Sequence, residues 1–131
     1  MTKSTLTIVV PALLGIVAPA YAQRLHVVRA IPGYRCMSLN LTESQLLNNS
    51  APVPVRSAPS SSAPQVGIAG ATVAVASPLH PVNGYLQMMF PNGAKVWIAA
   101  DRLRPWRSPS NPQARCTPAL LSNGKPGFDY R

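Results

Sequence analysis

The sequence predicts a small all-β domain of four or five short strands with proline-rich connections, and three observations support this prediction. Thirteen of the fifteen prolines lie outside the first 22 residues, and proline disfavours helix interiors because it lacks a backbone N–H. β-Branched residues alternate along Thr72–Ala76, as they do in a strand. Asn92-Gly93 separates the apolar runs Tyr85–Phe90 and Lys95–Ile98, and this dipeptide favours a hairpin because both residues tolerate positive φ.

The first 22 residues have the three-part organisation of a secretory signal peptide. Lys3 supplies a positive start, an apolar run covers Leu6–Ala18, and Ala20-Tyr21-Ala22 matches the small-x-small cleavage pattern. The run is too short to predict a membrane span, and an uncleaved N-terminal anchor is the alternative. We expect cleavage after Ala22, a periplasmic or secreted mature chain of residues 23–131, and no stable membrane span after cleavage.

Cys36 and Cys116 are the only two cysteines, and both follow the predicted cleavage site. Exported chains with a small, even number of cysteines usually pair them, because the compartment is oxidising. We therefore predict a disulfide that closes a loop of about 80 residues and contributes about 4.5 kcal/mol in the chain-entropy model. A reactive thiol at Cys36, next to Arg35 and with His80 as a base, is the alternative, but no spacing couples these residues.

Residues 23–52 form a predicted N-terminal extension of helix and coil. Leu25–Val28 is strand-like, and Thr42-x-x-Gln45 fits a capping box, in which both side chains satisfy backbone donors at a helix start. The helix would end near Asn49 and cover one end of the barrel. Its apolar face would consist of Leu41, Leu46 and Leu47.

Residues 53–107 are the predicted barrel, an arrangement that leaves no strand edge exposed. Pro59–Pro64 has loop composition, and Asp101–Leu103 is a short turn after the hairpin. Residues 108–131 form a C-terminal extension that is tethered at Cys116, and the tail beyond Cys116 is a candidate for disorder. The predicted core consists of Val55, Val73, Val75, Leu86 or its neighbours, Ile98 and Leu103.

Several motifs between Val53 and Leu103 follow the pattern of one known family. Val55–Ser60 reads V-R-S-A-P-S where the family has V-R-S-G-P-S, and the hairpin follows G-W-x-x-V-x-x-x-D/N-G-x-x-G-W-V-x-x-x-Y-L without a gap. The matching positions after the first motif are Gly67, Val73, Val75, Gly84, Tyr85, Met88, Asn92, Gly93, Trp97, Ile98 and Leu103. This half of the mature chain therefore resembles the bacterial SH3-like (SH3b) domains, and the resemblance implies a small SH3-like barrel.

Three positions depart from the family pattern. Val96 stands in place of the glycine before the tryptophan, and Ala58 replaces a loop glycine. Arg102 replaces the usual late aromatic residue, which removes one aromatic from a binding shelf. Trp97 is expected in the core or at its rim.

The charge of the chain points to an anionic partner. Only three acids balance twelve basic residues, and the net charge of +9 becomes +8 without Lys3. Outside the cytoplasm the available polyanions include cell-wall carboxylates, outer-membrane sugars and lipid headgroups, whereas export argues against nucleic acid. The resemblance likewise implies envelope binding for many family members. Our candidate ligand-binding residues are Tyr85, Trp97, Arg102, Arg104, Trp106 and Arg107. For the basic cluster among them, a solvated surface without a ligand is the alternative.

We expect a non-catalytic binding module without metal or cofactor. The three acids are far apart in sequence, His26 and His80 share no ligand spacing with the cysteines, and no glycine-rich phosphate loop is present. The predicted ligand is peptidoglycan or another anionic envelope polymer. The alternative is a protein–protein contact or an accessory-subunit role in the periplasm.

Overall fold

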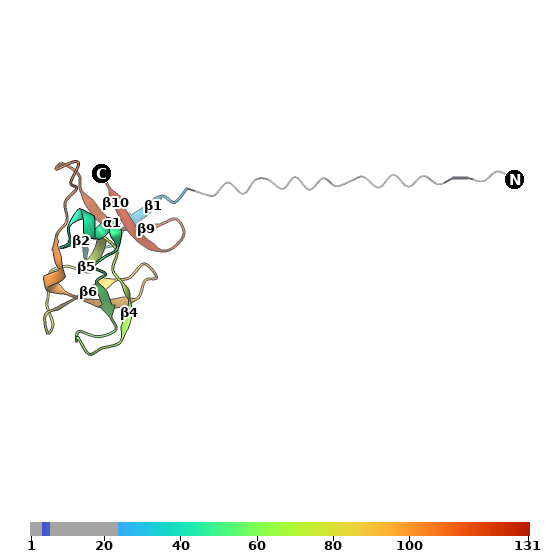
Figure 1. Ribbon diagram of the computed structural model, residues 1–131. Helices are drawn as coiled ribbons and strands as arrows, with labels where there is room; N and C mark the ends of the chain where they lie inside the picture. Colours follow the sequence, from blue (N-terminus) through green and yellow to red (C-terminus); the bar gives the residue numbers. More distant parts are fainter. Residues whose placement is uncertain (1–3, 6–23) are drawn as a thin grey trace.

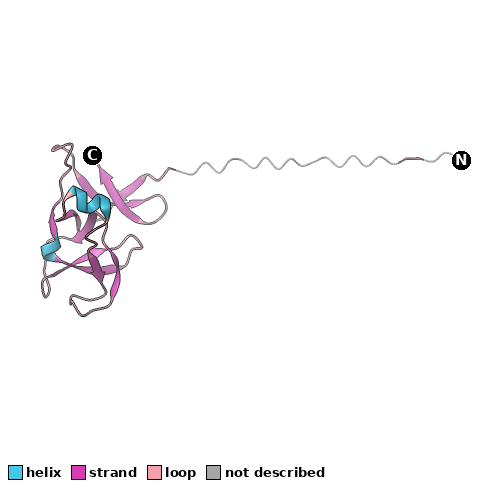
Figure 2. Cartoon of the chain, in the orientation of Figure 1, coloured by secondary structure: helices cyan, strands magenta, loops and turns pink. Residues whose placement is uncertain are grey.

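The computed structural model describes residues 4–5 and 24–131 of the chain. The predicted signal peptide lies outside the described residues apart from residues 4 and 5, so it stays a prediction. Nearly all regular structure is antiparallel β-sheet, as predicted (Figure 2).

The larger sheet has seven strands in the order β4-β3-β7-β6-β5-β2-β8. Strands β5, β6 and β7 are consecutive neighbours in it, and the β6–β7 hairpin turns at Asn92-Gly93 with Gly93 at φ 85°. This hairpin was predicted. In chain order the strands are β2 (Tyr34–Leu39), β3 (Pro54–Arg56), β4 (Gln65–Ile68), β5 (Thr72–Ala76), β6 (Tyr85–Met89), β7 (Lys95–Ala99) and β8 (Leu103–Pro105).

The sheet stays open, because β4 and β8 are its two edges and do not pair with each other. Strand β2, from the predicted N-terminal extension, pairs with β5 on one side and β8 on the other. It therefore separates β5 from β8, two strands of the predicted 53–107 unit. The all-β class is confirmed, whereas the closed SH3-like barrel is not.

A second sheet of three strands has the order β1-β9-β10. It joins β1 (Val27–Ala30) to a hairpin of β9 (Cys116–Leu121) and β10 (Pro126–Tyr130). The tail beyond Cys116 was a candidate for disorder, but this segment forms the hairpin. In Figure 1, β1, β9 and β10 gather at the upper end of the view, and β4 and β6 lie toward the lower end.

Two short helical segments connect the strands. Helix α1 (Glu43–Asn48) begins with the predicted capping box, in which Thr42 and Gln45 each accept a hydrogen bond from the other's backbone N–H, and ends at Asn49 with φ 53°. A single 3₁₀ turn, η1 (Ala100–Arg102), leads from β7 into β8. Leu41 and Leu46 pack against the core, as predicted, but Leu47 is exposed.

The main core lies on the inner face of the seven-stranded sheet. All six predicted core residues are buried there, which confirms the alternation used to choose them. The structure shows six further core residues that the sequence analysis did not list: Met37, Leu39, Val53, Ala69, Met88 and Val96. Met37 and Leu39 belong to β2, so the core draws on a strand that we had placed outside the domain.

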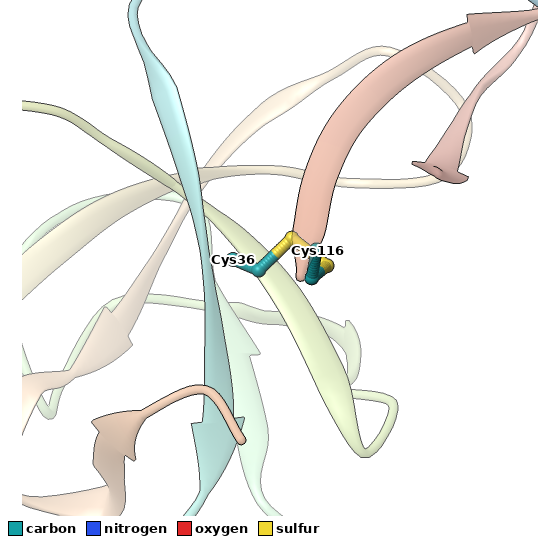
Figure 3. The surroundings of a disulfide bond; sticks show 2 residues. All are labelled: Cys36 and Cys116. Atoms are coloured by element: carbon teal, nitrogen blue, oxygen red, sulfur yellow. A yellow bond between two sulfur atoms is a disulfide. The ribbon is translucent and has the colours of Figure 1, made fainter. Parts of the chain in front are cut away.

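The predicted disulfide is confirmed and joins the two sheets (Figure 3). Cys36 lies in β2 of the larger sheet, Cys116 opens β9 of the smaller one, and their Cα atoms are 6.0 Å apart. Alternation along β2 directs Cys36 away from the main core, so the bridge ties the smaller sheet to the outer face of the larger one. Such bonds persist in oxidising compartments, so the disulfide favours a location outside the cytoplasm.

Gly67 in β4 packs directly against the ring of Phe90. A Cβ placed on Gly67 would lie 2.5 Å from Phe90 Cζ, so the ring must shift before alanine fits. We expect Gly67→Ala to lower the free energy of unfolding by about 1–2 kcal/mol, as overpacking typically does. Urea unfolding followed by tryptophan fluorescence measures this change.

Gly70→Ala is the matched control for this substitution. Gly70 follows the same strand, and a Cβ placed on it would meet nothing closer than Thr72 O at 3.8 Å. We expect its free energy of unfolding to change by less than about 0.5 kcal/mol. Equal effects of the two substitutions would contradict the role assigned to the Phe90 contact.

Candidate functional site

Two of the candidate residues, Tyr85 and Trp97, lie on the outer face of the β6–β7 hairpin. Leu86 and Ile98 face the core, so their neighbours Tyr85 and Trp97 point outward and are half-buried. Tyr85 pairs with Ala99 and Trp97 pairs with Gln87, which makes the two aromatics diagonal neighbours on one face. Trp97 therefore lies at the rim of the fold, within the expectation from the sequence.

Arg56 joins these aromatics from β3. It pairs with Trp97 across the strands, and its guanidinium donates a hydrogen bond to the carbonyl of Ala63 at 3.0 Å. This bond fixes the loop before β4 and uses part of the donor capacity of Arg56. Arg102 lies apart from this group in η1, where its backbone carbonyl accepts a hydrogen bond from Asn40 at 2.8 Å.

The other three candidates come together in one pocket of about 250 Å³. Arg104 lies on β8 opposite Ser38 of β2, and Trp106 and Arg107 follow directly after the strand. All three line the pocket together with Tyr130 from β10. We call this cavity the basic-aromatic pocket, after the four lining residues Arg104, Trp106, Arg107 and Tyr130.

Trp106 is held in this pocket by an aromatic contact. Its ring stacks on Tyr130 with centroids 5.8 Å apart and an angle of 26° between the planes. Phe128 continues the row, with its ring 6.0 Å from that of Tyr130. The contact bridges the two sheets, so the C-terminal hairpin forms one wall of the basic-aromatic pocket.

The positive charge of the pocket is not neutralised by the protein. Among the described residues the one ion pair joins Arg131 to Asp129, with Nε and Oδ2 3.0 Å apart. Arg104 and Arg107 therefore meet no carboxylate there, and the buried Nε of Arg104 has no hydrogen-bond partner. Arg104 therefore keeps at least one donor, its Nε, that no protein acceptor satisfies.

The sequence did not single out Tyr130 or Ser38, which complete this pocket. A signal for Tyr130 was present: Asn123-Gly124 separates an apolar run from Pro126–Tyr130, as Asn92-Gly93 does in the predicted hairpin. Gly124 has φ 79° and closes the β9–β10 turn. No signal placed Ser38 beside β8, because that pairing joins strands about 65 residues apart in sequence.

In the described part of the chain, no cluster of three or more His, Cys, Asp or Glu side chains is placed to hold a metal ion. None of its helices has the length and apolar character needed to cross a membrane. Comparisons with protein-family models, with curated proteins and with solved structures found no significant match.

Proposed function

We propose that the mature chain is a non-catalytic, exported binding module of SH3-like type that holds an anionic polymer of the cell envelope. The observation that supports this best is the basic-aromatic pocket, where two arginines without carboxylate partners flank a stacked aromatic pair. Peptidoglycan offers the matching chemistry, since it combines peptide carboxylates with sugar rings.

The two kinds of side chain would bind different parts of that polymer. An arginine guanidinium pairs a carboxylate or phosphate with two parallel N–H donors, which fixes the orientation of the anion. The exposed side of an aromatic ring packs on the apolar face of a sugar or peptide. Tyr130 is 55 % exposed and Arg107 is exposed, so both are open to such a ligand.

Export and the SH3-like assignment belong to the same proposal. The Cys36–Cys116 disulfide supports an oxidising compartment, and the signal-peptide pattern supplies the route. The positions that resemble SH3b domains include core and turn residues here: Val73, Val75, Met88 and Ile98 are buried, and Gly84 and Gly93 have positive φ.

Co-sedimentation of residues 23–131 with purified sacculi across a salt series tests the proposal. We expect binding that weakens steeply between low and physiological salt, because exposed charges are screened. Hydrogen bonds to charged groups contribute about 1.5–3 kcal/mol each. Arg104→Ala/Arg107→Ala should therefore weaken binding by about tenfold or more.

Arg24→Ala/Arg29→Ala is the matched control, because it removes the same charge from two exposed positions, one before β1 and one within it. We expect the control to weaken binding by less than about threefold, as rim charges do. Equal losses in both double variants would mean that total charge, and not the pocket, attracts the polymer. An absence of pelleting at every salt concentration would overturn the envelope-polymer proposal in favour of a periplasmic protein partner.

A further inference from the structure

A second, apolar pocket of about 260 Å³ lies between the two sheets. Its lining includes Ile68 of β4, Ala74 of β5 and Met89 of β6 from the larger sheet, and Phe128 of β10 from the smaller one. Thr72 is the one lining residue with a polar side chain. We call this cavity the intersheet pocket. It is distinct from the basic-aromatic pocket, although Thr72 borders both.

The intersheet pocket is bordered by a free strand edge. Among the described residues, strand β10 is the last in its sheet and pairs only with β9. Arg131 exchanges both backbone hydrogen bonds with Arg115, and Lys125 accepts one from Leu121. In an antiparallel ladder these bonds alternate, so the backbone groups of Phe128 and Tyr130 point away from β9.

Apolar walls beside a free edge fit an extended peptide. A peptide strand laid along β10 would receive hydrogen bonds from the N–H groups of Phe128 and Tyr130 and donate its own to their carbonyls. Its side chains that face the larger sheet would then lie over the intersheet pocket. Because alternate side chains of a strand share a face, one large apolar side chain would enter the pocket.

The charges near the pocket define the flanks of this peptide. Lys125 precedes the lining residue Pro126, and Lys95 lies directly across from Met89; both lysines are exposed. None of the described residues that line the pocket is acidic, and Asp129 on β10 is paired with Arg131. Acidic residues beside the apolar one would be attracted to the two lysines, whereas a second copy of this chain would bring its own positive charge.

We propose that the β10 edge and the intersheet pocket bind an extended peptide segment that carries one large apolar residue flanked by acidic residues. This binding goes beyond the proposed function. The two sites meet at Tyr130, whose side chain lines the basic-aromatic pocket and whose backbone belongs to the β10 edge. The volume fits a side chain better than a drug-sized molecule, since such ligands usually occupy about 300–1,000 Å³. An acyl chain would fill the pocket but leave the N–H groups of the edge unbound.

Selection from a random seven-residue peptide library on immobilised residues 23–131 tests this proposal. We expect enrichment of peptides with one large apolar residue and Asp or Glu within two positions of it. The enriched peptide, added to ¹⁵N-labelled protein, should slow hydrogen exchange at the amides of Phe128 and Tyr130. Methylating the backbone nitrogens of that peptide should weaken binding about tenfold or more, because the edge contacts depend on them.

Ile68→Asp and Val66→Asp form a matched pair for the pocket itself. Both residues lie on β4, Ile68 is 50 % and Val66 47 % exposed, and only Ile68 lines the pocket. We expect Ile68→Asp to weaken peptide binding by about tenfold or more and Val66→Asp by less than about threefold. Both variants should still bind sacculi, which separates this proposal from the previous one.

Three results would overturn the proposal. The first is a library without an enriched motif, and the second is an equal effect of the two aspartate substitutions. The third is binding of dodecanoate in the pocket, with no peptide protecting the amides of Phe128 and Tyr130, which would assign the pocket to an acyl chain.

Discussion

Replacing both cysteines, as Cys36→Ala/Cys116→Ala, is expected to lower the free energy of unfolding by about 3–4.5 kcal/mol. The bridge spans a sequence separation of 80 residues, and in the chain-entropy model a loop of that size restricts the unfolded chain by an amount near the upper figure. A small domain has about 5–15 kcal/mol of stability in total, so this variant loses a large share of it. Urea unfolding of residues 23–131 measures the difference.

The effect should also be local, because the bridge joins the two sheets. Without the bridge, the β9–β10 hairpin is still held by its pairing with β1 and by the stack of Tyr130 on Trp106. We expect amide exchange in β9 and β10 to accelerate more than exchange in β5 and β6, as in a unit that opens by itself. Amides in both sheets that accelerate equally would contradict this assignment.

Reduction provides the control for the cysteine variant. Dithiothreitol should destabilise the wild-type protein by a similar amount and leave the double variant unchanged. A loss below about 1 kcal/mol in both experiments would mean that the bridge does not restrict the unfolded chain as the loop-entropy account requires.

The parts of the fold that sequence predicted are those set by local patterns. The capping box of Thr42 and Gln45 and the Asn92-Gly93 hairpin both formed as expected, because each depends on residues within a few positions of one another. The alternation of Val73 and Val75 identified the buried face of β5 for the same reason. The thirteen prolines after residue 22 likewise predicted that the mature chain has no long helix.

The parts that sequence did not predict depend on distant pairing. Strand β2 lies between β5 and β8, and nothing in Tyr34–Leu39 indicates which strands will accept it. The β9–β10 hairpin is a different case, since Asn123-Gly124 is a readable turn signal, but it stands in a segment rich in proline and small polar residues.

The candidate site shows the same contrast between residues that are close in sequence and residues that only the fold brings together. Arg104, Trp106 and Arg107 are close in sequence and share one pocket. Tyr85 and Trp97 were grouped with them from the family pattern, but they lie on the outer face of the β6–β7 hairpin and do not line that pocket. Tyr130, which stacks on Trp106, required the C-terminal hairpin to be known.

Truncating Ile98 to alanine is expected to lower the free energy of unfolding by about 3 kcal/mol. Ile98 is among the largest fully buried side chains, with no exposed surface, and it packs in the one cluster that unites β2 with β5, β6 and β7. The substitution removes three carbon atoms from a site enclosed by the sheet. Such truncations cost about 2–5 kcal/mol, because the lost burial adds to the cavity left behind.

Ile68→Ala makes the same chemical change at a half-exposed position of β4, where solvent already reaches the side chain. We expect it to cost less than about 1 kcal/mol, since little burial is lost and no closed cavity forms. Urea unfolding of both variants gives the comparison. Equal costs would mean that the inner face of the seven-stranded sheet is not the main core. In that case the fold would depend chiefly on the contact between the two sheets, and the cysteine variant would then exceed the loss that loop entropy alone predicts.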